Sequence, residues 1–169
     1  MGNEKTVRIG IIGCGGIANG KHMPSLRQIP GVQMVAFCDI IEERARKAKQ
    51  DYGTPDAAVY TDYRKLLEDK TIDVVHVCTP NRAHSFITVD ALHAGKHVMC
   101  EKPMAINAAE AKKMLDAAKE TGKLLTIGYQ SRQRADAQYR SASPARSVTS
   151  TTPRLPLSAG APCRRGACS

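Results

Sequence analysis

The chain has 169 residues, of which 42% are hydrophobic and 4% aromatic, and it contains no tryptophan. This length and composition suit one globular domain with an aliphatic core. No apolar run approaches the roughly 18 residues that a membrane-spanning helix needs, and the N-terminus shows no signal-peptide pattern. We therefore expect a cytoplasmic protein without a membrane partner.

The net charge of +9 divides unequally along the chain. Residues 1–140 carry 21 basic and 16 acidic side chains (+5), and residues 141–169 carry four arginines and no acid (+4). Neither part interleaves basic with aromatic residues, as a surface that stacks nucleic-acid bases would. We expect no nucleic-acid partner, and DNA binding through the arginine-containing tail ranks as the weakest hypothesis.

Cysteine placement argues against disulfides and metal sites. Four of the six cysteines lie in or just after apolar runs, where small buried thiols are common: Cys14, Cys38, Cys78 and Cys100. No Cys-x-x-Cys pair or Cys/His cluster has the spacing of metal ligands. The sequence predicts buried, reduced thiols and no metal.

Apolar runs and helical patterns alternate over the first 130 residues. Five runs predict strands: Val7–Ile12, Val32–Cys38, Val74–Cys78, His97–Cys100 and Leu124–Tyr129. Helical patterns lie at Glu42–Tyr52 before Gly53, at Phe86, Val89 and Ala91–Leu92 before Gly95, and at Ala111, Met114, Leu115 and Ala118. This order predicts an α/β fold, a doubly wound, mostly parallel sheet of the Rossmann type.

A glycine-rich segment follows the first predicted strand and opens a predicted helix. Gly13 allows the tight turn, Gly15 lets the backbone approach a pyrophosphate, and Ala18 is small enough for close packing of helix on strand. The helix start at Gly16 and Ile17 would direct free amides at the phosphates. The pattern predicts a dinucleotide site, although such turns also occur for packing alone.

Asp39 ends the second predicted strand, 21 residues after Ala18. A carboxylate there accepts hydrogen bonds from ribose hydroxyls and repels a 2′-phosphate. The following residues are Ile40 and Ile41 rather than arginine. The sequence therefore favours NAD over NADP, and a simple turn role for Asp39 is the alternative.

The same segment also partly matches a second motif, the phosphate-binding P-loop, which is an alternative to the dinucleotide-binding pattern. Gly15-x-x-x-x-Gly20-Lys21 matches most of it, but His22 stands where the Mg²⁺-binding Ser or Thr belongs. The Gly-Lys pair would also fall inside the first predicted helix. We interpret this match as coincidence.

Two later segments carry a family resemblance, together with the glycine run and Gly128-Tyr129-Gln130. They are Val77-Cys78-Thr79-Pro80-Asn81-Arg82-Ala83-His84 and Ala94-Gly95-Lys96-His97-Val98-Met99-Cys100-Glu101-Lys102-Pro103. Over about residues 5–140 the chain resembles the N-terminal domain of the Gfo/Idh/MocA oxidoreductases. The Glu-Lys-Pro element is the most distinctive part of this resemblance.

The resemblance implies hydride transfer between a nicotinamide cofactor and a hydroxyl-bearing carbon of a sugar, cyclitol or related polyol. It implies that Lys102 is catalytic, reaching the reacting hydroxyl beside the nicotinamide. Further residues are implied in the cofactor cleft: Thr79, Pro80, Asn81, His84 and Glu101. The histidines at 22, 76, 93 and 97 are left without a functional assignment.

The family is about twice as long as this chain, and its second, α+β domain supplies the substrate pocket and the oligomer interface. We expect that domain to be absent from this chain. We therefore expect residues 1–140 to be an NAD(P)-binding domain that is inactive by itself and self-associates through its uncovered interface. A non-catalytic NAD-binding module is the alternative.

Residues 141–169 match no part of the family. They contain six Ser, four Pro and no aromatic residue, a composition that predicts disorder. Shifting the reading frame of codons compatible with Ser143–Leu155 permits family-like sequence, so a frameshifted tail is a hypothesis. It fails if the gene shows no single-base change near codon 140 that restores a long frame.

Overall fold

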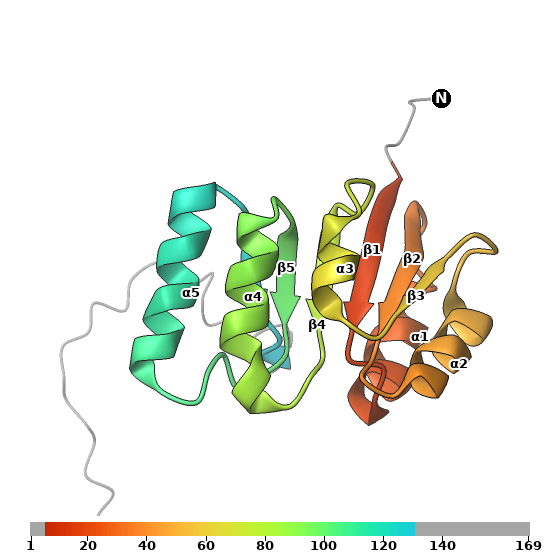
Figure 1. The fold of residues 1–169 in the computed structure, drawn as a ribbon, viewed down its shortest axis with the longest axis horizontal. Coiled ribbons are helices and arrows are strands. Elements are labelled where there is room, and N and C mark those ends of the chain that lie inside the picture. Colours follow the sequence, from red (N-terminus) through yellow and green to blue (C-terminus); the bar gives the residue numbers. More distant parts are fainter. Residues whose placement is uncertain (1–5, 131–169) are drawn as a thin grey trace, which may run out of the picture. The chain divides into compact units, whose positions relative to one another are not determined.

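The computed structural model describes residues 6–130 (Figure 1). Its strands are β1 (Val7–Ile12), β2 (Val32–Cys38), β3 (Ala58–Tyr60), β4 (Val74–Val77), β5 (His97–Cys100) and β6 (Leu125–Ile127). They form one sheet in the order β3-β2-β1-β4-β5-β6, and all neighbouring strands run parallel. The prediction of a doubly wound Rossmann sheet is confirmed. The tail, with Cys163 and Cys168, lies outside the described residues. The predictions of disorder and of a frameshift therefore concern residues that the structure does not describe.

Helices cover both faces of this sheet. They are a π-helix η1 (Ala18–His22), α1 (Met23–Leu26), α2 (Glu42–Tyr52), α3 (Tyr63–Glu68), a 3₁₀-helix η2 (Asn81–Ala83), α4 (His84–His93) and α5 (Ala108–Thr121). One core cluster joins α1 and α2 to Ile9 and Ile11 of β1. The other joins α3, α4 and α5 to Ile12 and the strands beside it. Successive side chains of β1 thus serve opposite layers.

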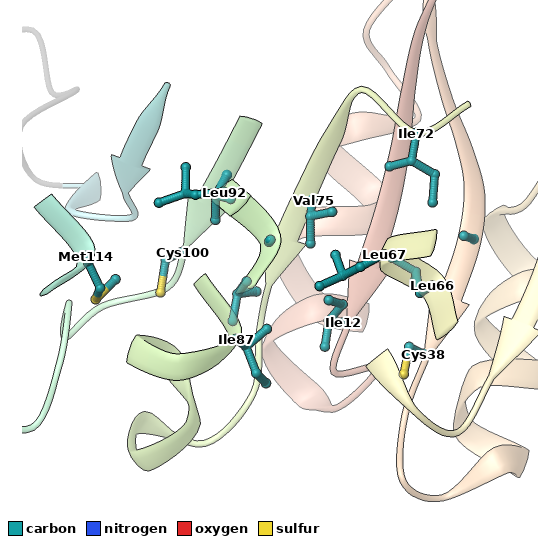
Figure 2. Packing of buried hydrophobic residues seen from close by; sticks show 14 of the residues in the cluster. Ile12, Cys38, Leu66, Leu67, Ile72, Val75, Ile87, Leu92, Cys100 and Met114 are labelled. Carbon is teal, nitrogen blue, oxygen red and sulfur yellow. The ribbon is translucent and has the colours of Figure 1, made fainter. Parts of the chain in front are cut away.

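Aliphatic packing fills the layer under α3, α4 and α5 (Figure 2). Leu67 of α3 belongs to the same core cluster as Ile12 of β1 and Val75 of β4. The neighbouring Leu66 fits over Gly10, where an added Cβ would lie 3.0 Å from its Cδ2 atom. Leu92 and Met114 continue the same core toward β5. An aliphatic core is the expected result of a sequence with few aromatic residues.

Local signals set the ends of the two longest helices. α2 has Glu42 and Glu43 in its first turn, where negative charge suits the helix dipole. Asn107 caps α5, because its Oδ1 accepts the Glu110 amide at 2.9 Å. Gly122 ends α5 in the left-handed conformation, with φ of +64°.

β3 and α3 had no counterpart in the sequence prediction. β3 is a three-residue edge strand whose side chains are all partly buried, so it shows neither a continuous apolar run nor a clear alternation. α3 has only six residues, and its main local signal is Asp62, which accepts the Arg64 amide at 2.9 Å. Hydrophobic periodicity is informative only over segments longer than these two elements.

The four described cysteines, at positions 14, 38, 78 and 100, are free and buried, as predicted. Burial raises the pKa of Cys14 and of Cys38 to about 12, and that of Cys100 to about 11. The pKa of Cys78 is raised further for the same reason. The thiolate is the reactive form of cysteine, so these side chains act as small core residues.

No helix within residues 6–130 has the length and apolarity needed to cross a membrane.

Candidate functional site

The carboxyl ends of the strands meet at one edge of the sheet, which Figure 1 shows as the edge that the arrows of β1 and β5 point toward. Backbone bonds extend beyond the strands there. The amides of Gly13 and Cys78 donate to the carbonyls of Cys38 and Ile12, each at 2.8 Å. The Glu101 amide donates to the Val77 carbonyl at 3.0 Å. In open α/β sheets this edge forms the ligand crevice.

Gly13 makes the turn after β1 possible. Its φ is +91°, and an added Cβ would lie 2.7 Å from the carbonyl carbon and oxygen of Cys78 and 2.9 Å from the Thr79 nitrogen. No side chain fits in that space. The glycine turn therefore lies directly against the loop that follows β4, at the point where strand order reverses.

Gly15 and Gly16 face open space. An added Cβ at either position would meet no atom within 4 Å. The helix begins at Gly16, and the first amides of a helix lack intrahelical acceptors. An accessible backbone beside such amides fits a pyrophosphate group. Ile17 is partly exposed beside this turn, whereas Ala18 is fully buried in the core.

Asn19 supports the same turn and was missed at the sequence level. Its Nδ2 donates to the carbonyl of Cys14 at 2.6 Å and to that of Gly15 at 3.0 Å. An asparagine inside a helical pattern gives little signal, because its partner depends on how the preceding turn is folded. Asn19 thus binds two consecutive carbonyls of the glycine turn.

Asp39 holds the turn from the other side. Its Oδ2 accepts the Cys14 amide at 2.9 Å, and its Oδ1 accepts the Ile41 amide at 2.9 Å. A carboxylate has about four lone-pair sites, so acceptor capacity for ribose hydroxyls remains. Asp39 is buried, and the adjacent Ile40 is 89% exposed. The turn role of Asp39 and its proposed cofactor role are therefore compatible.

The loop after β4 presents a mixed set of side chains. Pro80 and Asn81 are exposed. Thr79 is partly buried, and its Oγ1 has no hydrogen-bond partner among the described residues. A buried hydroxyl without a partner is costly, which fits an additional ligand contact at this position.

His84 lies under this loop rather than on its surface. Its side chain is fully buried, and its role in the cofactor cleft stays a prediction. Its Nε2 lies 2.8 Å from the Thr79 carbonyl oxygen and its Nδ1 lies 2.7 Å from the Pro103 carbonyl oxygen. His84 connects the loops that follow β4 and β5.

Glu101 and Lys102 follow β5 and differ in exposure. Lys102 is exposed, whereas Glu101 is buried. Glu101 Oε2 accepts the Lys102 amide at 2.9 Å, and Oε1 lies 2.8 Å from Nε2 of His22. Glu101 is therefore engaged by protein groups, and Lys102 is the member of the pair that is free to meet a ligand.

His22 and His76 also belong to this site, although no sequence pattern predicted a role for either of them. Their Nδ1 atoms lie 3.3 Å apart, and their rings meet edge to face. Burial, followed by the charge of His22, lowers the pKa of His76 to about 4. The contact brings together residues 54 positions apart, which no local pattern could reveal.

Comparison with known proteins decides the family. Residues 7–129 match the Gfo/Idh/MocA family, described as an oxidoreductase family with an NAD-binding Rossmann fold. The chain belongs to this family. It is 38% identical over 128 residues to the inositol 2-dehydrogenase of Salmonella typhimurium and 35% identical over 126 residues to the myo-inositol 2-dehydrogenase of Thermotoga maritima.

Solved structures give the same result. The chain is similar to a myo-inositol 2-dehydrogenase from Lactobacillus plantarum, with a TM-score of 0.72 and 28% identity over 80% of this chain and 40% of that one. It is similar to a 3-ketoreductase from Actinomadura kijaniata in complex with NADP and TDP-benzene, with a TM-score of 0.70 and 30% identity over 80% and 43%.

The chain spans a little over a third of its curated relatives. The alignments to the Salmonella and Thermotoga enzymes each cover 75% of this chain, but 38% and 37% of those proteins. This Gfo/Idh/MocA chain is thus an NAD-binding oxidoreductase domain by family. The NADP in the ketoreductase structure shows that the choice between NAD and NADP is not fixed by the fold.

Alanine substitutions at Gly13 and Gly15 distinguish a glycine needed for the fold of the turn from a glycine needed for access of the ligand to the backbone. We expect Gly13→Ala to destabilise the fold by about 2–4 kcal/mol, from left-handed strain and overpacking against the β4 loop. We expect Gly15→Ala to leave the denaturation midpoint nearly unchanged but to weaken dinucleotide binding at least about tenfold. Urea denaturation and NADH titration measure both, with Gly20→Ala, where an added Cβ also meets no atom within 4 Å, as control for the effect of an added methyl. Equal stability of the Gly13 and Gly15 variants would contradict the argument.

The lowered pKa of His76 predicts acid sensitivity. The unfolded chain takes up this proton near pH 6.5 and the folded chain near pH 4, so this stabilisation is complete above pH 6.5 and lost as the pH falls toward 4. Over this whole pH range it amounts to roughly 3 kcal/mol, at about 1.4 kcal/mol for each unit of pKa.

Denaturant unfolding at pH 7 and pH 4.5 tests this acid sensitivity. The proteins compared are the wild type, His76→Phe and, as an exposed control, His93→Phe. The pH dependence should be smaller for His76→Phe than for the other two proteins. Identical pH dependence in all three would show that His76 is not responsible.

Proposed function

We propose that this domain binds a nicotinamide dinucleotide, with NAD preferred, and serves an oxidoreductase that acts on a hydroxyl-bearing carbon of a sugar, cyclitol or related polyol. The main support for this proposal is that the glycine turn, Asp39 and Lys102 all lie at the edge of the sheet where the strands have their carboxyl ends. The polyol class is supported by the relatives, among them inositol 2-dehydrogenases.

The binding role is divided among residues of three loops. The open backbone of Gly15 and Gly16 would take the pyrophosphate, and Asp39 would accept the ribose hydroxyls. Thr79 would offer its hydroxyl, which has no hydrogen-bond partner within residues 6–130, from the loop after β4, with Pro80 and Asn81 beside it. The nicotinamide supplies hydride chemistry when bound.

Lys102 is the proposed catalytic residue. It is exposed at the carboxyl end of β5, while its neighbour Glu101 is held inside the fold. An ammonium group there can hydrogen-bond the substrate oxygen as negative charge develops on it, and can assist the transfer of its proton. Lys102 therefore combines accessibility with a fixed backbone.

NAD preference follows from charge at the end of β2. The Asp39 carboxylate would repel a 2′-phosphate, and the exposed Ile40 offers no compensating positive charge. Asp39 also keeps two backbone amides bound, so it is fixed in place. A cation at position 40 would relieve the repulsion.

The remaining parts of the proposal concern the whole chain. We assign residues 1–140 to the cofactor-binding domain and expect a cytoplasmic protein that self-associates and binds neither membrane nor nucleic acid.

Cofactor titration tests the binding proposal. By fluorescence titration, we expect NADH to bind at least about tenfold more tightly than NADPH, because one unfavourable charge contact costs on the order of 1–2 kcal/mol. Ile40→Arg should bring the two affinities together. Ile29→Arg, an equally non-conservative change at another exposed isoleucine, should not. Absence of binding of either nucleotide to the folded wild type would refute the proposal.

A non-catalytic NAD-binding module is the second candidate, because the chain spans little over a third of its relatives. A screen of cyclitols and sugars for NADH formation separates the two functions. If turnover occurs, Lys102→Met should reduce it by about 100-fold or more while NADH affinity stays unchanged. Lys119→Met, at an exposed site on α5, is the control. Binding without turnover across the screen favours the module.

A further inference from the structure

Four groups from three parts of the chain form a continuous hydrogen-bonded chain behind Lys102. Nδ1 of His76 lies 3.3 Å from Nδ1 of His22, and Nε2 of His22 lies 2.8 Å from Glu101 Oε1. Glu101 Oε2 in turn accepts the Lys102 amide at 2.9 Å. β4 and the helix after β1 are thereby connected to the backbone of the residue proposed to act on substrate.

We propose that His22 is a positioning residue for Lys102, acting through the Glu101 side chain. This inference rests on the proposed function, because the importance of a fixed Lys102 depends on its catalytic role. His22 does not need to contact cofactor or substrate. It holds the carboxylate whose second oxygen fixes the Lys102 amide.

Burial makes this pairing strong. The side chains of His22 and Glu101 are 9% and 12% exposed, and a buried carboxylate without donors is costly. Glu101 also has little room to move, because an added Cβ on Gly128 would lie 3.2 Å from its Oε1. The His22 N–H therefore selects one orientation of the carboxylate.

The π-helix sets the direction of His22. The Met23 amide donates to the Ala18 carbonyl, five residues earlier, instead of the four-residue spacing of an α-helix. Such a turn contains one extra residue, and each residue of a helix rotates the side chain by about 100°. Without this extra residue a different side chain would face Glu101.

Both neighbours of Lys102 are consequently fixed. Glu101 is held by His22 and by its own amide, which donates to the Val77 carbonyl at 3.0 Å. The Pro103 carbonyl oxygen lies 2.7 Å from Nδ1 of His84. The Lys102 side chain itself is exposed, so its reach is set by the backbone that carries it.

A matched pair of substitutions tests the role of the His22 Nε2 atom. In His22→Gln the side-chain nitrogen lies as many bonds from Cβ as Nε2 does, so the donor to Glu101 is kept. In His22→Asn it takes the place of Nδ1, so the donor is lost. Amide hydrogen exchange at Lys102, followed by NMR, reports the loop directly.

We expect the Lys102 amide to exchange at least tenfold faster in His22→Asn than in wild type, and within about threefold of wild type in His22→Gln. The Val98 amide, which donates to the Leu124 carbonyl at 2.8 Å, serves as the internal reference for an intact sheet. Equal Lys102 exchange in the two variants, with Val98 still protected, would overturn the proposal.

A measurement on the wild type avoids any dependence on variant folding. Long-range ¹⁵N–¹H spectra should show a proton on Nε2 of His22, because that atom must donate to Glu101. A ring without a proton there would overturn the proposal. Neither measurement requires nucleotide, so failure of NADH binding would contradict the proposed function and leave this test intact. If turnover is established, His22→Asn should lower kcat at unchanged NADH affinity, and His22→Gln should restore it.

Discussion

The close approach of two backbones organises this domain. At Gly13 the chain leaves β1 so near the loop after β4 that the carbonyl of Cys78 occupies the space of a side chain. This contact joins the two strands between which the sheet reverses its direction of winding. The glycine turn, the loop carrying Thr79 and the end of β2 are brought to one edge as a result.

Polar groups buried beneath that edge maintain its shape. Asp39 and Asn19 bind the glycine turn from opposite sides, while His84 connects the loops after β4 and β5. Each of these side chains satisfies backbone groups that would otherwise lose hydrogen bonds on leaving water. The residues exposed at the surface, among them Lys102, therefore depend on a second set of residues below them.

The sequence predicted the parts of this arrangement that local patterns encode. Continuous apolar runs identified β1, β2, β4 and β5 because parallel strands covered on both faces need them. The glycine turn was visible because only glycine fits such a backbone. Glu42–Tyr52 was predicted with its observed bounds, since acidic residues at its start and Gly53 at its end mark both termini.

Contacts between distant residues were not predictable in the same way. His22 and Glu101 are separated by 79 positions. The π-helix that directs His22 toward Glu101 was not predicted from any pattern in the sequence. The burial of His84 and its contacts with two loops were also not predictable, because a motif gives the position of a residue along the chain but not its depth in the fold. β3 has only three residues, and all three side chains are partly buried, so it shows no alternation of buried and exposed side chains that would reveal a strand.

The two tasks of Asp39 constrain how this domain can diversify. Its carboxylate caps the Cys14 amide in the glycine turn, and the same group is the one that would discriminate between nucleotides. Replacing it to admit a 2′-phosphate would also remove a structural acceptor, so a gain in one property is coupled to a loss in the other. Position 40 carries no such dual role, since its side chain is almost fully exposed. Evolutionary change in cofactor preference is therefore easier beside the carboxylate than at it.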